Sequence, residues 1–247
     1  MVNNSARRAV VIGGSSGIGY GLATGIADAG YQVHVLSRTA PPSTENIHWT
    51  SCDLTNFDAT EATLLQLAKE PIDILCFSAA FYGPKRRTLA ATPVREWTTQ
   101  VDIMLHGLWI ALHTCLPALT VNAPGLIVGV SSEVIYNLGP GRSGYAAVKA
   151  AASTLIRSVA QEFTPDTLRI VEVLPQGMVD SPGIRARRSS DFDYSGYMQA
   201  QDFRSVGRYL ATTRGSEVHG LALEVRAGGE WQSVMRGALP PSQSTIS

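Results

Sequence analysis

Short apolar runs recur along this chain, separated by stretches in which apolar residues repeat with a helical period. The apolar runs are residues 9–12, 32–36, 47–52, 72–77, 125–130, 169–174 and 221–225. The longest helical stretches are residues 20–29, 57–69, 94–116 and 145–162. Runs this short and rich in β-branched residues are typical of parallel strands that are buried on both faces. The alternation therefore predicts a single α/β domain spanning residues 1–247, with a mainly parallel sheet of about seven strands flanked by helices.

A glycine-rich turn connects the first predicted strand to the first predicted helix. Residues 13–19 read G-G-S-S-G-I-G. A strand, a glycine turn and a helix start form the arrangement that binds the pyrophosphate of a dinucleotide, because glycines let the backbone approach and the helix N-terminus favours negative charge. Glycine turns are also common without any ligand. We expect Gly13, Ser15, Ser16, Gly17 and Ile18 to contact a cofactor.

The residue after the second predicted strand indicates which nicotinamide cofactor is used. Ser37 and Arg38 stand there, about twenty residues past the glycines, with no acidic neighbour. An acidic residue at this position would hold the ribose 2′-hydroxyl of NAD(H), whereas an arginine suits the 2′-phosphate of NADP(H). A solvated arginine at a strand end is the alternative. We expect NADP(H) rather than NAD(H).

Small or polar residues also follow the third and fourth predicted strands. These are Asp53 and Leu54 after one strand, and Ser78 and Ala79 after the other. Ligands of open α/β sheets bind at the carboxyl ends of the strands, so we expect all four residues at the cofactor site. For Asp53, capping of the helix that follows is an equal alternative.

A tyrosine and a lysine four residues apart, Tyr145 and Lys149, lie on one face of a predicted helix. A nearby ammonium stabilises a phenolate and moves its pKa from about 10 toward neutrality, where it can transfer protons. Ser131 and Ser132 follow the fifth predicted strand and belong to the same edge of the sheet. Taken alone, the tyrosine–lysine pair is more often plain packing, and the two serines are ordinary turn residues.

Composition narrows the class of protein. Hydrophobic residues make up 45% and charged residues 16%, which indicates a globular domain, and the formal net charge is zero. Nothing in the charge favours a nucleic acid or an anionic membrane as partner. No unbroken apolar run has the length of a membrane span, and no signal peptide precedes the first strand. Cys52, Cys76 and Cys115 lack metal-ligand or disulfide spacing, so we expect buried free thiols, no metal and a cytoplasmic protein.

Several of these motifs occur together, in the order and at the spacings of the short-chain dehydrogenase/reductase family, which the chain resembles over nearly its whole length. The glycines match that family's T-G-x-x-x-G-x-G, although Ile12 occupies the threonine position, and Ser132 precedes Tyr145 by thirteen residues. Asp53, Pro175 and the pair at 228–229 match further family positions. The resemblance implies a Rossmann-like, doubly wound parallel sheet.

The resemblance also implies an activity and a set of catalytic residues. Tyr145 would exchange a proton with the carbonyl or alcohol oxygen of a small-molecule substrate, and Ser132 would orient that oxygen. Lys149 would lower the pKa of the phenol and hold the nicotinamide ribose, with Pro175 beside the cofactor. The family further implies a homodimer or homotetramer built through the helices at 94–116 and 145–162.

Three positions depart from the family pattern. The family's N-N-A-G reads Phe77-Ser78-Ala79-Ala80, and Pro175 is followed by Gln176 before the glycine. Met104 aligns with a structural and catalytic asparagine that usually helps to hold a water on the lysine. These changes leave serine, tyrosine and lysine in place but leave the proton relay open. Non-redox chemistry with bound NADP, or cofactor sensing without turnover, are the alternatives to a reductase.

Substrate recognition is weakly marked in the sequence. Candidate pocket residues are Phe81, Tyr82, Glu133, Tyr136, Gln176 and Met178, which follow strand ends. Residues 181–203 replace the segment that covers the substrate in the family, and their arginines suit either an acidic or phosphorylated substrate or, more often, a solvated basic turn. Residues 1–7 and 239–247 are expected to be flexible tails.

Overall fold

The computed structural model describes residues 6–234 of the 247-residue chain. It contains an eight-stranded sheet with strand order β3-β2-β1-β4-β5-β6-β7-β8. The strands are β1 (Arg8–Ile12), β2 (Gln32–Ser37), β3 (Ile47–Ser51), β4 (Ile74–Phe77), β5 (Gly125–Val130), β6 (Leu168–Pro175), β7 (Ala222–Val225) and β8 (Trp231–Val234). β1 to β7 pair in parallel, and β8 is antiparallel to β7. The predicted single-domain, doubly wound α/β fold is confirmed, with one strand more than expected.

The additional strand arises from the two glycines after β7. Gly228 and Gly229 both have positive φ, +87° and +83°, as a tight hairpin turn requires. The Arg226 amide donates to the Glu230 carbonyl at 2.8 Å and closes the turn. A Gly-Gly pair between apolar runs is a hairpin signal, so β8 could have been read from the sequence.

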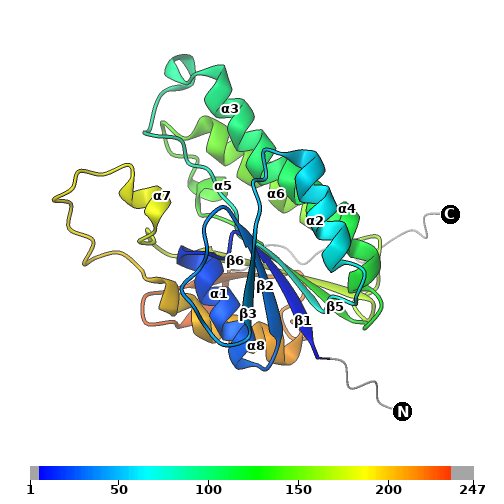
Figure 1. The fold of residues 1–247 in the computed structure, drawn as a ribbon. Coiled ribbons are helices and arrows are strands. Elements are labelled where there is room, and N and C mark those ends of the chain that lie inside the picture. Colours follow the sequence, from blue (N-terminus) through cyan, green and yellow to red (C-terminus); the bar gives the residue numbers. More distant parts are fainter. Residues whose placement is uncertain (1–5, 235–247) are drawn as a thin grey trace, which may run out of the picture.

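Helices cover both faces of the sheet (Figure 1). They are α1 (Gly17–Asp28), α2 (Phe57–Leu67), α3 (Val94–Val101), α4 (Gly107–Leu119), α5 (Val134–Asn137), α6 (Ser143–Ala160), α7 (Pro182–Arg185) and α8 (Arg204–Thr213), with 3₁₀ turns η1 (Leu89–Ala91) and η3 (Ala200–Phe203) and a π turn η2 (Asp102–His106). One core packs α1 and α8 onto the sheet, and a second core packs α2, α4 and α6 onto the opposite face. The central strands β1, β4 and β5 are therefore buried on two sides, which explains their nearly continuous apolar runs, whereas the edge strands β3 and β8 are largely exposed.

The long helix that begins at Val94 does not stop before Pro117, as the sequence had suggested. It runs from α3 through the π turn and α4 to Leu119, with Pro117 inside the last turn. The missing proline N–H falls close to the helix end, where one lost hydrogen bond is tolerated. Within residues 6–234 this stretch qualifies as a membrane span by length and composition alone. Its apolar residues Leu108, Leu112 and Cys115 pack in the core of the domain.

The N-terminal tail is shorter than predicted. Arg7 donates to the Ala29 carbonyl at 2.7 Å, and its guanidinium lies 4.5 Å from the centre of the Tyr31 ring. Its own carbonyl accepts from the Gln32 amide at 2.8 Å. Arg7 is thus already tied to the sheet. Residues 1–5 and 239–247, the rest of the predicted tails, lie outside the described residues.

Helix α1 lies against η3 in a contact that leaves no room for a side chain at Gly21. A Cβ placed there would come within 1.8 Å of the Ala200 carbonyl oxygen and 2.9 Å of the Phe203 Cβ. The segment before α8, which leads back from the pocket, is fixed to α1 by this contact.

We expect Gly21→Ala to destabilise the protein by about 3 kcal/mol, because the added methyl forces two backbones apart. Without the contact, alanine in a helix would stabilise by roughly 0.5–1 kcal/mol, so the sign is informative. Urea unfolding monitored by circular dichroism measures the change. Gly196→Ala is the matched control, since nothing lies within 4 Å of a Cβ at that position. Equal stability of the two variants would contradict the close packing.

Candidate active site

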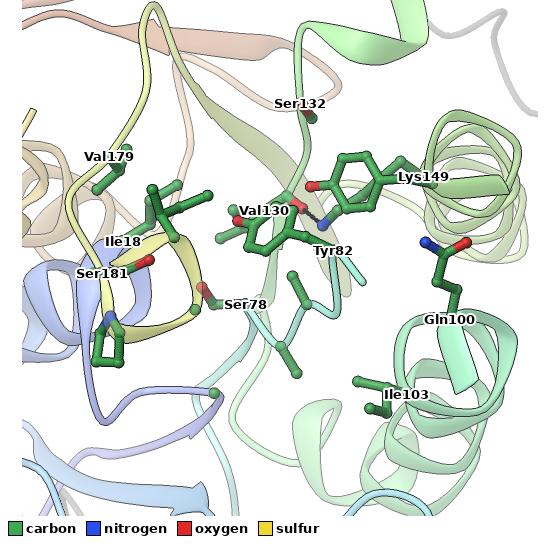
Figure 2. A pocket seen from close by; sticks show the side chains of 18 of the residues that line it. Ile18, Ser78, Tyr82, Gln100, Ile103, Val130, Ser132, Lys149, Val179 and Ser181 are labelled. Atoms are coloured by element: carbon green, nitrogen blue, oxygen red, sulfur yellow. Dashed lines mark hydrogen bonds between the residues drawn. The ribbon is translucent and has the colours of Figure 1, made fainter. Parts of the chain in front are cut away.

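A pocket of about 720 Å³ opens at the carboxyl ends of the parallel strands. It lies where the strand order reverses between β1 and β4, the position at which open α/β sheets bind ligands. The glycine turn, the residues after β2 to β6, and the starts of α6 and α7 form its wall. Figure 2 shows Tyr82 in the middle of this pocket, between Ile18, Val179 and Ser181 on one side and Lys149 on the other.

Every residue that the sequence assigned to the cofactor lines this pocket. They are Gly13, Ser15, Ser16, Gly17, Ile18, Ser37, Arg38, Asp53, Leu54, Ser78, Ala79, Tyr145, Lys149 and Pro175. Parallel strands point their carboxyl ends to the same edge, which is why segments far apart in sequence meet here.

The glycine turn is held against the end of β4. Gly13 has φ +82°, and a Cβ there would lie 2.5 Å from the Ala79 amide nitrogen. The Gly13 amide donates to the Leu36 carbonyl, and the Ser78 amide donates to the Ile12 carbonyl, both at 2.8 Å. The small residues Ser78 and Ala79, which replace the family's amide at this place, allow that approach.

Asp53 belongs to the pocket and does not cap α2. Its carboxylate accepts from the amide and the hydroxyl of Thr55, at 3.0 and 2.8 Å. These bonds, and to a smaller extent the charge of Arg38, lower the pKa of Asp53. Asn56 caps α2 instead, accepting from the Ala59 amide at 3.2 Å. The capping alternative for Asp53 was therefore wrong, because the chain makes a further turn before the helix starts.

Tyr145 is buried in α6, and Ser132 and Tyr82 are the polar neighbours that act on its phenol. The rings of Tyr82 and Tyr145 have centres 5.1 Å apart. Burial raises the pKa of Tyr145 well above 10, with the neighbouring Tyr82 adding to the shift. The expectation that Lys149 would lower this pKa is not met in this structure. The Lys149 Nζ lies 6.0 Å from the Tyr145 ring centre and donates to the Val130 carbonyl at 2.8 Å instead (Figure 2).

The pKa of Lys149 is also shifted by burial. The lysine side chain is 5% exposed, and burial lowers its pKa to about 8, against the opposing charge of Glu172. Glu172 lies on β6, is buried as well, and accepts from the Ser153 hydroxyl at 2.9 Å. The ammonium therefore has a carboxylate behind it, which favours its charged form at neutral pH.

Met104 sits in the π turn, where the family places its asparagine, and is fully buried. It shares a small cavity with Lys149, Ser153 and Glu172. A thioether cannot replace an amide as a hydrogen-bonding group. The polar groups nearest to Lys149 on this side come instead from β6 and from α6 itself.

The Ser132 hydroxyl is hydrogen-bonded to the side chain of the next residue, Glu133. This hydroxyl donates to Glu133 Oε2 at 2.9 Å, and Arg142 Nη1 donates to Glu133 Oε1 at 3.0 Å. Arg142 also donates to Asn137 Oδ1 at 2.8 Å. The direction of the Ser132 hydroxyl is thus set by a carboxylate that an arginine holds in place.

The structure brings only some of the predicted substrate residues to the pocket wall. Glu133, Met178 and Tyr82 line the pocket, but Phe81, Tyr136 and Gln176 do not. Phe81 and Tyr82 are adjacent in a non-helical loop, and of the two only Tyr82 reaches the pocket. The Gln176 amide extends the sheet by donating to the Val225 carbonyl, which leaves its side chain exposed.

Several other lining residues were not among the individual residues predicted from the sequence, although two of them belong to the 181–203 segment that was expected to cover the substrate. Gln100 and Ile103 come from the long helix, Arg142 precedes α6, and Ser181 and Ile184 belong to the start of the 181–203 segment. Contacts between a helix face and a distant strand end depend on tertiary packing, so neither spacing nor composition could show them. The loop after α7, yellow in Figure 1, extends away from the body of the domain.

The pocket contains polar atoms without partners. Among the described residues, six buried side-chain nitrogen or oxygen atoms form no hydrogen bond, and four of them belong to pocket residues: Gln100 Oε1, Ser131 Oγ, Arg142 Nε and Arg187 Nε. Buried polar atoms are normally paired, because leaving them unpaired costs free energy. Their concentration here fits a pocket that receives a polar ligand.

Residues 7–191 match the model of the short chain dehydrogenase family. The chain belongs to this family. Among short-chain dehydrogenases, it is 27% identical over 191 residues to 2-(R)-hydroxypropyl-CoM dehydrogenase of Xanthobacter autotrophicus, covering 72% of this chain and 76% of that one. It is also 27% identical over 241 residues to cis-4-hydroxycyclohexanecarboxylate dehydrogenase of Sinomonas cyclohexanicum, covering 90% and 96%.

The fold of this short-chain dehydrogenase is shared by solved structures. A putative NAD(P) dependent gluconate 5-dehydrogenase from Beutenbergia cavernae superposes with a TM-score of 0.77 at 24% identity, over 91% of this chain and 97% of that one. The family resemblance found in the sequence and the Rossmann-like fold are both confirmed. The chain is accordingly an oxidoreductase by family.

The depressed pKa of Lys149 predicts a particular pH dependence of stability. Its folded pKa of about 8 lies below the 10.5 of an unperturbed lysine, so the unfolded chain binds more protons between these values. Stability therefore rises with pH in this window. From pH 8 to 9.5, we expect the wild type to gain about 1–2 kcal/mol in free energy of unfolding relative to Lys149→Met.

Urea unfolding at several pH values measures this difference. Lys69→Met, which removes an exposed lysine, is the control and should follow the wild type in parallel. A constant difference between the wild type and Lys149→Met from pH 8 to 9.5 would show that Lys149 titrates normally.

Proposed function

We propose that the protein is an NADP(H)-dependent reductase or dehydrogenase that interconverts a ketone or aldehyde and an alcohol. One observation supports it above the others: Ser132, Tyr145 and Lys149 meet in the pocket that the glycine turn and Arg38 also line. NADP(H), when bound, supplies or accepts the hydride. The glycine turn at the start of α1, which lines the pocket, and the unpaired polar atoms of the wall fit a group of that kind.

In the reductive direction, Tyr145 gives its phenol proton to the substrate oxygen. Because burial raises the pKa of Tyr145, the phenol holds its proton at neutral pH until negative charge develops on that oxygen. Ser132 turns its hydroxyl from Glu133 to the same oxygen and fixes its position. In the oxidative direction the phenolate form of Tyr145 takes up the alcohol proton, and Ser132 again orients the oxygen.

Lys149 acts on Tyr145 through its charge. Its pKa of about 8 keeps the ammonium protonated at pH 7, so a positive charge stands near the phenol when a proton leaves it. Glu172 and Ser153 hold a negative charge behind the ammonium. Glu172 and Ser153 thus give Lys149 polar neighbours, which Met104 cannot do.

Tyr145→Phe tests the proton-transfer role. We expect turnover to fall about 10²- to 10⁴-fold, while NADPH binding persists, because the variant loses only the transferable proton. NADPH oxidation at 340 nm over a panel of ketones and aldehydes gives turnover, and fluorescence titration gives cofactor affinity. Near-normal turnover in Tyr145→Phe would remove Tyr145 from this role, and no oxidation with any carbonyl would overturn the reductase.

Arg38→Ala tests the choice of cofactor. Arg38 is exposed at the end of β2 and lines the pocket beside Asp53. We expect the KM for NADPH to rise about 10- to 100-fold and that for NADH to change little, because a charged hydrogen bond to a phosphate is lost. Arg95→Ala, an equal charge change on exposed α3, is the control. Comparable KM values for both cofactors in the wild type would contradict the NADP(H) assignment.

Non-redox chemistry with bound NADP is the second candidate. Two features favour it: the apolar Met104 at the asparagine position, and Glu133, which occupies the Ser132 hydroxyl. Formation of product without any change in the redox state of the cofactor would select this reading over the first.

A further inference from the structure

Positive charge is concentrated around the end of the pocket where Tyr82 and Tyr145 lie. Five cationic side chains line this part of the wall, namely Lys85, Arg86, Arg87, Arg142 and Arg187, against the two carboxylates Glu96 and Glu133. The chain as a whole has no net charge, so the excess is local.

Two of the five cations are neutralised within the wall. Arg87 Nη1 donates to Glu96 Oε2 at 2.6 Å, and Arg142 Nη1 donates to Glu133 Oε1 at 3.0 Å. Both carboxylates are used in these pairs. The charges of Lys85, Arg86 and Arg187 have no carboxylate partner within the described residues.

Arg187 differs from the other two arginines of its segment. Arg185 forms a two-bond ion pair with Asp180, at 2.6 and 2.7 Å, and is exposed. Arg188 is exposed, donates to the Tyr197 hydroxyl at 3.1 Å, and lies outside the pocket wall. Arg187 alone enters the wall. Of the three arginines in the basic turn expected from the sequence, Arg185 and Arg188 therefore bond to residues of their own segment, and Arg187 lines the pocket.

The guanidinium of Arg187 is partly withdrawn from water. Its Nε is buried and has no hydrogen-bond partner. Burial lowers the pKa of Arg187, and the charges of Arg188 and Arg86 lower it further, although an arginine remains charged near neutrality. An oxyanion at this place would accept from the guanidinium and offset the repulsion between the cations.

The Tyr82 ring is near both the Arg187 guanidinium and the ring of Tyr145, the proposed proton donor. The Arg187 Cζ lies 5.8 Å from the Tyr82 ring centre, and that ring lies 5.1 Å from the Tyr145 ring. A molecule whose oxygen reaches Tyr145 therefore passes the Tyr82 ring before it reaches Arg187. Its reacting carbon and its anionic group would be separated by several bonds or by a ring.

We propose that Arg187, with Arg86 beside it, forms an anion-binding subsite, and that the substrate is a ketone or alcohol bearing a carboxylate, sulfonate or phosphate group. The ketone or alcohol group of this substrate rests on the proposed function, whereas the binding of its anionic group at Arg187 does not. Arg187 is a specificity-determining residue here, and Tyr145 remains the proton donor.

Matched pairs of ketones test the subsite with the full-length protein and NADPH. The pairs are 4-acetylbenzoate and 4-acetylbenzamide, 4-acetylbenzenesulfonate and its sulfonamide, 4-acetylphenyl phosphate and 4-methoxyacetophenone, and 4-oxocyclohexanecarboxylate and its carboxamide. We expect kcat/KM to favour at least one anion over its neutral partner by about 10- to 100-fold, with the difference shrinking as salt rises. The preferred anion identifies the oxyacid.

Arg187→Gln should remove this preference. We expect kcat/KM for the anion to fall about 10- to 100-fold and that for the neutral ketone to stay within about twofold, because only the charged contact is lost. Arg188→Gln removes the same charge from the neighbouring exposed position and is the control. It should leave the preference intact, since long-range charge alone is screened by salt.

The outcomes separate the subsite from the reaction. Equal kcat/KM for anionic and neutral ketones in the wild type overturns the subsite and leaves the reductase standing. An equal loss for both members of a pair in Arg187→Gln, or a raised KM for NADPH, assigns Arg187 to the cofactor or to folding and overturns the subsite.

A binding measurement decides the case in which no ketone turns over. Isothermal titration of 4-acetylbenzoate and 4-acetylbenzenesulfonate into the wild type with NADP⁺ should show binding that their neutral partners lack and that Arg187→Gln weakens. Such binding without turnover supports the subsite while the proposed function fails. Binding that is equal for charged and neutral partners, or unchanged in Arg187→Gln, overturns the subsite.

Discussion

The contact between the glycine turn and the end of β4 is the constraint on which the pocket depends. Gly13 at φ +82° lies so close to the Ala79 backbone that no side chain fits between them. The Gly13 amide ties this turn to the end of β2, and the Ser78 amide ties the end of β4 to the end of β1. With these strand ends held together, the residues that follow them share one edge of the sheet. The close approach is therefore between backbones, and it requires a glycine at position 13.

Burial sets the acid–base character of the site more than pairwise charge does. The pKa values of Tyr145 and Lys149 move in opposite directions, each toward its uncharged form, because both groups are withdrawn from water. The charge of Glu172 opposes the shift for Lys149, whereas the charge of Glu133 raises the pKa of Tyr145 further. The phenol therefore acts as a proton donor first, and the ammonium as the charge that supports it when the proton leaves.

Ion pairs in the wall determine which charges remain available to a ligand. Glu133 and Glu96 neutralise Arg142 and Arg87, and Glu133 also fixes the Ser132 hydroxyl. Arg187 has no such partner, although it belongs to the same short segment as the paired Arg185. Neighbouring residues of one type thus take different roles, because packing directs one into the pocket and leaves the other at the surface.

The sequence alone determined the order of strands and helices, the family, and the set of residues around the glycine turn, Ser132, Tyr145 and Lys149. These follow from local patterns: apolar period, turn residues and fixed spacing along the chain. Only the tertiary structure decided that Tyr82 and not Phe81 enters the pocket, that Asn56 and not Asp53 caps α2, and that Glu172 stands behind Lys149. Each of these depends on which side chain a neighbouring element buries or leaves to water, and that is fixed by packing between segments that no local pattern connects.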